Sequence, residues 1–147
     1  MSLFQNIVII LVLIAGAGFL SLTEIALAGA RKVKLKILAE SGDDRAQKVL
    51  NLQENSADFF AASQIGLNAV AILGGILGEG AFRPYFMSFV SRFYTGPWSE
   101  TIRFALSFSL VTSLFILFVD LMPKRLAMIA PEHISIAVIN LIQLFIK

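Results

Sequence analysis

Cysteine is absent from the 147 residues of the chain, and histidine occurs once, as His133. Without cysteine, disulfide bonds and thiolate metal sites are excluded. His133 follows Pro131 and Glu132 at the expected membrane edge, so a catalytic triad built on histidine is not predicted. The sequence also shows neither a phosphate-binding loop nor a nucleophile paired with a base. We therefore do not expect an enzyme.

Charged residues are scarce as well, at 15% of the chain, and the net charge is only +2. This charge is too small to predict binding to nucleic acid. Hydrophobic residues fill 57% of the positions and the mean hydropathy is +0.81, well above the composition of a soluble domain. The composition predicts an all-α membrane protein in contact with the lipid bilayer, with one membrane domain over residues 1–147.

Three apolar runs are each long enough for a helix that crosses a bilayer core of about 30 Å. We predict spans over about residues 3–24, 59–78 and 104–122. The first run lacks a basic leader and exceeds the core of a signal peptide, so we expect it to be retained. The second run is rich in glycine, which predicts either close helix packing or a broken, partly re-entrant helix.

The polar segment over residues 30–55 has the apolar spacing of two amphipathic helices, interrupted by Ser41–Asp44. Basic residues outnumber acidic ones there by six to four, and most of them directly follow the first span. The positive-inside rule then predicts a cytoplasmic helical hairpin, with the N-terminus outside and the C-terminus in the cytoplasm.

Two further segments complete the expected organisation. Residues 79–103 combine turn signals with many aromatic side chains, which predicts a loop at the outer membrane surface. Residues 132–147 follow a helix start at Pro131, but such a helix is too short to span. This last segment is either an interfacial juxtamembrane helix or the beginning of a fourth span.

Each apolar run carries one strongly polar residue, namely Glu24, Asn68 or Asp120. A charged side chain in a bilayer costs roughly 3 kcal/mol by the gentlest scale, so it normally faces a cavity, a partner or an ion. Ser21 shares a helix face with Glu24, whereas Thr23 points about 160° away from Ser21 on a regular helix. All three converge only if the first helix is distorted there, for example by a π-bulge.

These oxygen-bearing side chains fit more than one role. Oxygen ligands suit hard cations such as magnesium or sodium, and two carboxylates facing one cavity also suit a cationic amine. Gln64 and Asn68, four residues apart, could instead bridge helices. Glu24 and Asp120 could pair with Arg31 or Lys124 at the membrane surface.

Four segments, in this order, resemble the transmembrane domain of the CorC and cyclin M (CNNM) cation transporters, also called DUF21. The segments are residues 19–27, 46–50, 65–68 and 118–124. The resemblance implies three transmembrane helices, a juxtamembrane belt helix, a homodimer and an inward-facing acidic cavity that holds a cation. It implies no cofactor in this chain, with Mg²⁺ or Na⁺ as the bound or transported ion.

The resemblance also assigns roles to residues. It implies cation ligands at Ser21, Thr23, Glu24, Asn68 and Asp120, of which all but Thr23 would contact a metal, with support from Gln64, Gly66 and Pro123. Two departures weaken the match to a magnesium site. Leu67 stands where family members have a first asparagine, and Val119 with Asp120 replaces a Gly-Glu pair.

Residues 64–75 resemble a bacterial inner-membrane branch of this family that is linked to polyamine export. We predict a cation exporter, first of a divalent ion such as magnesium, coupled to sodium or to the membrane potential. The alternatives are export of putrescine and cadaverine, or a membrane sensor or scaffold that transports nothing. Family members usually continue into cytosolic CBS domains and a CorC-type domain, so the chain is interpreted as a truncated membrane domain.

Overall fold

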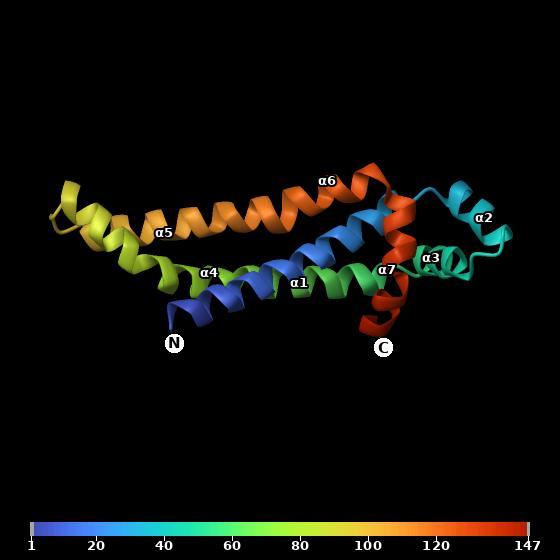
Figure 1. Ribbon diagram of the computed structural model, residues 1–147, viewed down its shortest axis with the longest axis horizontal. Coiled ribbons are helices and arrows are strands. Elements are labelled where there is room, and N and C mark those ends of the chain that lie inside the picture. The colour runs from blue at the N-terminus through green and yellow to red at the C-terminus, as the bar shows by residue number, and fades with distance from the viewer. Residues whose placement is uncertain (1, 147) are drawn as a thin grey trace.

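Three long helices form the body of the computed structural model, which describes residues 2–146 (Figure 1). The first is α1 (Leu3–Gly29) and the second is α4 (Ala57–Phe93). The third combines α5 (Ser99–Phe115), η1 (Ile116–Leu121) and α6 (Met122–Ile129). All three are long and apolar enough to cross a membrane. The predicted all-α membrane fold with three spans is confirmed.

The first helix is regular from end to end. Ser2 and Gln5 form a capping box at its start, and the helix continues to Gly29, five residues past the predicted end at 24. The distortion near Thr23 that would let Ser21, Thr23 and Glu24 converge is therefore absent from α1. The Thr23 hydroxyl donates to the Leu20 carbonyl oxygen over 2.9 Å, a bond that a regular helix accommodates within its own turn.

The second helix is continuous, which corrects two boundary predictions. It does not break at its glycines, and it runs 15 residues past the predicted end at 78. Most of the predicted 79–103 loop is therefore helical, and only residues 94–98 connect α4 to α5. The glycines serve close packing instead, because a Cβ atom at Gly74 would overlap the Phe115 ring and one at Gly78 would overlap Val111.

The distortion expected in the first helix lies in the third. Residues 116–121 form a π-helix that contains Asp120 and ends just before Pro123. Because proline has no backbone N–H, the Val119 carbonyl cannot receive the usual bond from position 123, which favours a wider turn there. The helix then continues through α6 rather than ending at the predicted residue 122.

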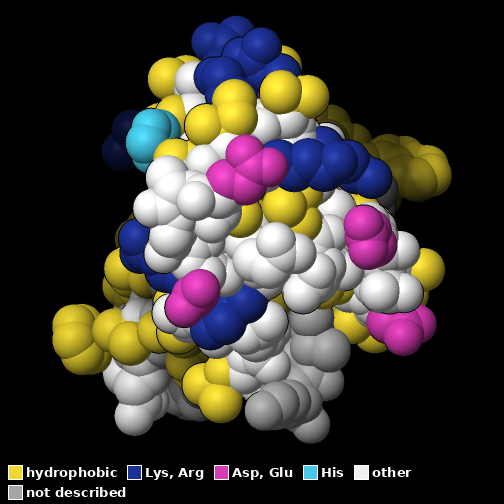
Figure 2. Space-filling view, turned by 90° about the vertical axis from the view of Figure 1, so that its right-hand side faces the viewer, with side chains coloured by type: hydrophobic (Ala, Val, Ile, Leu, Met, Phe, Trp, Pro, Cys, Tyr) yellow, Lys and Arg dark blue, Asp and Glu magenta, His cyan; other side chains and the backbone are white. Residues whose placement is uncertain are grey.

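A helical hairpin follows α1, as predicted, and consists of α2 (Lys32–Glu40) and α3 (Asp44–Glu54). Gly42 adopts a φ of 103° at the turn, and Asp43 caps α3 by accepting from the Arg45 backbone N–H over 3.0 Å. Figure 2 looks onto this end of the molecule, where basic and acidic side chains spread across the surface.

The last helix, α7 (Pro131–Ile146), crosses the three long helices instead of running beside them (Figure 1). It therefore has the orientation of a juxtamembrane helix, not that of a fourth span. Its buried side chains join a core with α1 and the hairpin, which includes Leu27, Leu35, Val49 and Ile139. This core stabilises one end of the molecule, which we call the hairpin end. The opposite end, at residues 94–98, is called the loop end.

Gln53 closes the junction between α1 and the hairpin. Its side-chain amide donates to the carbonyl oxygens of Leu27 and Ala30, each over 2.9 Å. The last carbonyl groups of a helix have no hydrogen-bond partner inside the helix. The Gln53 side chain supplies a donor to two of these groups at the end of α1. These two hydrogen bonds hold α3 against the C-terminal end of α1.

Candidate functional site

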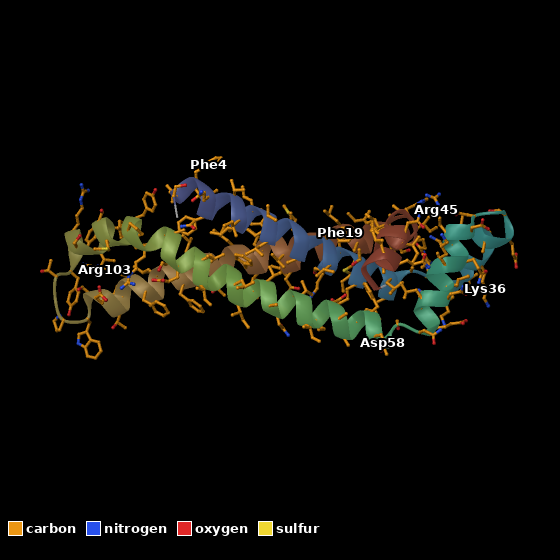
Figure 3. All side chains as sticks on the ribbon, turned by 90° about the horizontal axis from the view of Figure 1, so that it is seen from below. Phe4, Phe19, Lys36, Arg45, Asp58 and Arg103 are labelled. Atoms are coloured by element: carbon orange, nitrogen blue, oxygen red, sulfur yellow. The ribbon has the colours of Figure 1, made fainter. Side chains whose placement is uncertain are left out.

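A cavity of about 750 Å³ lies between α4 and the third long helix, and α1 contributes Glu24 to its wall. It extends from Gln64 to Glu79 along α4, which is about 22 Å of helix. Figure 3 shows the two ends of the molecule between which it runs, with Asp58 near the hairpin and Arg103 near the loop. The cavity is therefore long and parallel to the predicted spans.

The cavity wall is mainly apolar and aromatic, with a few polar groups toward its ends. The polar lining residues are Glu24, Gln64, Asn68, Glu79, Thr112, Asp120 and Lys124. One side is open, since the lining residues Ile72 and Ile76 are 64% and 66% exposed. Such a groove can hold an elongated molecule that has polar ends and an apolar middle.

Three predicted site residues come together at the hairpin end of the cavity. Glu24, Asn68 and Asp120 all line it, although each belongs to a different long helix. Glu24 accepts a hydrogen bond from the Gln64 side-chain amide over 2.8 Å. Asp120 forms a close ion pair with Lys124, one turn further along the chain. Pairing of Asp120 with Lys124 is one of the alternatives that the sequence left open for this carboxylate, and the structure contains it.

Ser21 and Thr23, the other two predicted ligands, do not line the cavity. Thr23 is fully buried and its hydroxyl is bound within its own helix. Ser21 is also buried, and its hydroxyl has no hydrogen-bond partner among the described residues. Thr23 points away from Glu24 because α1 is a regular helix there, whereas Ser21 is buried although it shares a helix face with Glu24. Their role as cation ligands stays a prediction.

The supporting residues are divided in the same way. Gln64 lines the cavity and binds Glu24. Gly66 instead faces α1, where a Cβ atom would lie 3.1 Å from the Leu20 side chain. Pro123 is buried against α1 near Gly18. Within residues 2–146, no three His, Cys, Asp or Glu side chains gather closely enough to hold a metal ion.

Sequence analysis missed Glu79, which lines the loop end of the cavity. The error followed from ending the second helix at residue 78. Gln64, Asn68, Gly75 and Glu79 lie on one stripe of a continuous α-helix, because they are separated by four, seven and four residues. That spacing was available in the sequence.

The loop end holds its charges less tightly than the hairpin end. Arg83 donates a hydrogen bond to Glu100 over 3.1 Å and so connects α4 to the start of α5. The distance from Arg83 Nε to Glu79 Oε1 is 3.8 Å, too long for a hydrogen bond. Glu79 Oε1 is buried and has no hydrogen-bond partner among residues 2–146.

A further carboxylate, Glu132, lies outside the cavity and clamps α7 to the end of α1. It accepts hydrogen bonds from the backbone N–H and the Nε of Arg31, over 3.3 and 3.4 Å, and lies 3.9 Å from the Lys34 ammonium. Arg31 thus pairs with Glu132 and not with Glu24. Burial alone would raise the pKa of Glu132, but backbone N–H bonds and these two cations outweigh it and lower that pKa.

Comparison of the sequence with known proteins identifies a family and several relatives. The model of the family described as "Cyclin M transmembrane N-terminal domain" matches residues 8–147. A relative from Escherichia coli K12, named polyamine export protein, is 56% identical over 94% of this chain and 31% of its own length. A protein of the same name from Haemophilus influenzae is 45% identical over 96% of this chain and 33% of its own length.

The chain therefore spans about a third of the length of these relatives. A more distant relative, UPF0053 protein sll0260 from Synechocystis, is 33% identical over 88% of this chain. The family match covers α1 from residue 8 onward, the other two long helices, the hairpin and α7, so it extends over nearly the whole arrangement described above. This chain belongs to the family of cyclin M transmembrane domains.

Proposed function

We propose that this chain forms the membrane-spanning part of an exporter for small polyamines such as putrescine and cadaverine. The observation that carries the proposal is the 56% identity, over 94% of the chain, to a protein named polyamine export protein. The chemistry of the cavity supports the same substrate class. This choice reverses the order of the two substrates that sequence analysis favoured, where magnesium came first.

A diamine needs acceptors for its ammonium groups and apolar contacts for its methylene chain. At the hairpin end, Glu24 and Asp120 offer carboxylates, and Asn68 offers an amide oxygen. Beyond them, Phe108 and Phe115 line the cavity and present aromatic surface to the methylenes. An ammonium over an aromatic face also gains about 0.5–1 kcal/mol at exposed sites. The cavity therefore contains both kinds of contact.

A magnesium ion makes different demands. It requires near-octahedral oxygen ligands at close range, and it gives up its water shell reluctantly. Here Leu67 lines the cavity at the position where the resemblance expects an asparagine, and Asp120 is paired with Lys124. The remaining oxygen groups are spread along a wide, mainly apolar groove. These features favour an elongated organic cation over a compact divalent ion.

The proposed transport cycle begins at the hairpin end, which we place in the cytoplasm of a bacterial inner membrane. An incoming ammonium group replaces the Lys124 ammonium at Asp120, while a second ammonium group binds Glu24. The substrate then moves along the apolar wall toward the loop end, driven by the membrane potential or by an exchanged ion. Lys124 returns to Asp120 and neutralises the empty site.

The open side of the cavity gives a reason for the expected homodimer. Gln64 and Asn68 are exposed there although they lie on a predicted span, and polar side chains at that depth rarely face lipid. We propose that a second copy of the chain covers this side. We also propose that cytosolic CBS domains regulate the complete protein, as in other family members. The competing function is a membrane sensor or scaffold.

Flux through proteoliposomes tests this proposal. Vesicles containing the protein should transport labelled putrescine, and Glu24→Gln and Asp120→Asn should each reduce the rate at least tenfold, because each removes an acceptor for an ammonium group. Glu40→Gln and Asp58→Asn are matched controls, since both residues are exposed and lie outside the cavity. Transport of magnesium but not putrescine would contradict the proposal, and no transport of either would favour the scaffold.

A further inference from the structure

The proposed function uses only the hairpin end of the cavity, yet the cavity continues to a third carboxylate. Glu79 lies eleven residues after Asn68 on the same helix, a separation of about 16 Å. Between them the wall is mainly apolar and includes Ile72, Phe108 and Val111. A single carboxylate at the far end of an apolar passage needs an explanation.

Glu79 is also the least satisfied charged group of the cavity. Its side chain is 19% exposed, whereas that of Asp120 is 51% exposed. Glu79 Oε1 is buried without a hydrogen-bond donor among the described residues. A buried carboxylate that lacks a donor is unfavourable, so its free energy falls when a cationic donor arrives.

The nearest cation does not supply that donor. Arg83 forms its hydrogen bond with Glu100 at 3.1 Å and stays 3.8 Å from Glu79. Glu100 therefore holds the guanidinium toward the start of α5. This arrangement keeps positive charge near Glu79 without occupying it, and leaves the carboxylate able to accept a hydrogen bond from another group.

We propose that Glu79 is a second ammonium-binding group, which receives an amino group of the substrate after it leaves the hairpin end. The inference rests on the proposed function and adds a step to it. A diamine with four or five methylene groups is much shorter than the separation of the two ends, so it binds them in succession. Because Glu79 binds the ammonium group at the loop end, the charge crosses a shorter distance without a carboxylate partner. Release of the substrate at the loop end is therefore faster.

The test compares Glu79→Gln with Arg83→Gln in proteoliposomes loaded with labelled putrescine. Glu79→Gln should slow efflux at least tenfold while leaving equilibrium binding of putrescine within twofold, because the hairpin end is intact. Arg83→Gln removes both of the arginine's ion pairs but spares the acceptor, so efflux should stay within twofold of the unaltered protein. Glu79→Asp, which keeps the charge, should restore most of the rate lost in Glu79→Gln.

Equal losses in Glu79→Gln and Arg83→Gln would overturn the inference, since they would show that Glu79 acts through its ion pair with Arg83 and not as an acceptor for the substrate. Unchanged efflux in Glu79→Gln would overturn it as well. Neither result touches the proposed function, which fails only if the unaltered protein does not transport putrescine.

Discussion

The two ends of the cavity hold their carboxylates in opposite ways. At the hairpin end, Asp120 is half exposed and closely paired with Lys124, and Glu24 receives a hydrogen bond from Gln64. At the loop end, Glu79 is mostly buried and lacks a hydrogen-bond donor among the described residues. A carboxylate that already accepts a hydrogen bond exchanges one donor for another, whereas a buried carboxylate that has only a loose ion pair, as Glu79 has with Arg83, gains from the first cationic donor it meets.

Under the proposed function, this difference favours movement of a charged substrate from the hairpin end to the loop end. In that proposal, an ammonium group that binds Asp120 displaces the Lys124 ammonium, so this binding is readily reversed. Binding at the loop end requires no displacement. The contrast depends on three features, which are the packing between the two ends, the tethered lysine and the support of the hairpin end from outside the cavity.

The largest effect should come from breaking the packing that aligns the two ends. Gly74→Ala and Gly78→Ala each add a Cβ atom that overlaps a side chain of α5, and overpacking of this kind typically costs about 1–3 kcal/mol. The helices should separate toward the loop end. Thermal unfolding in detergent measures the loss of stability, and the fluorescence of Trp98, the single tryptophan, reports on the loop.

Gly80→Ala is the matched control for these substitutions. A Cβ atom at Gly80 would have no neighbour within 4 Å, and alanine favours a helix over glycine by about 1 kcal/mol. This variant should be as stable as the unaltered protein or slightly more stable. Equal destabilisation by all three substitutions would contradict the account of the packing.

A smaller effect should follow when the hairpin end is made to resemble the loop end. Lys124→Gln removes the tethered cation from Asp120, so putrescine should bind more tightly, by up to about fivefold for a partly exposed ion pair. Release should slow by a similar factor. Arg125→Gln, at the exposed neighbouring position, should change neither quantity. Weaker binding of putrescine in Lys124→Gln would contradict this prediction, because it would show that Lys124 supports substrate binding and does not compete with the substrate for Asp120.

The smallest effect concerns the clamp at Glu132, which supports the hairpin end from outside. Its pKa is lowered in the folded protein, so its stabilising effect is complete above the ordinary glutamate value of about 4.3 and is lost as the pH falls through the lower folded value. Because Arg31 and Lys34 are largely exposed, we expect a loss below about 1 kcal/mol.

Thermal unfolding in detergent at a series of pH values from neutral to below 4 measures this loss. Glu132→Gln is the control, since it removes the titrating group and should flatten this part of the pH dependence. A stability that rises toward acid pH in the unaltered protein, but not in Glu132→Gln, would contradict the assigned sign.

Much of this arrangement follows from the sequence, and particular residues show where prediction stops. Glu24, Asn68 and Asp120 are conspicuous because polar groups are costly in a span, and all three do line one cavity. The family resemblance grouped Ser21 and Thr23 with Glu24, although helix periodicity already placed Thr23 on another face of α1. Their separation depends on how α1 packs against α4 and α6.

Glycine and proline caused the remaining errors, because each has two opposite structural uses. The glycines of α4 weaken a helix in isolation, but here they admit the Phe115 and Val111 side chains of α5. Pro123 ends many helices, but here a π-helix precedes it and the helix continues. Only the neighbouring helix decides between the two uses, and the sequence of one segment does not contain that information.

The most direct test of the central claim is a calorimetric titration of the purified protein with putrescine, magnesium and sodium. We predict saturable binding of putrescine that Asp120→Asn and Glu24→Gln weaken at least tenfold, with magnesium competing only weakly and sodium not at all. Tight binding of magnesium that putrescine does not displace, lost in the same two variants, would contradict the claim that this cavity recognises a polyamine.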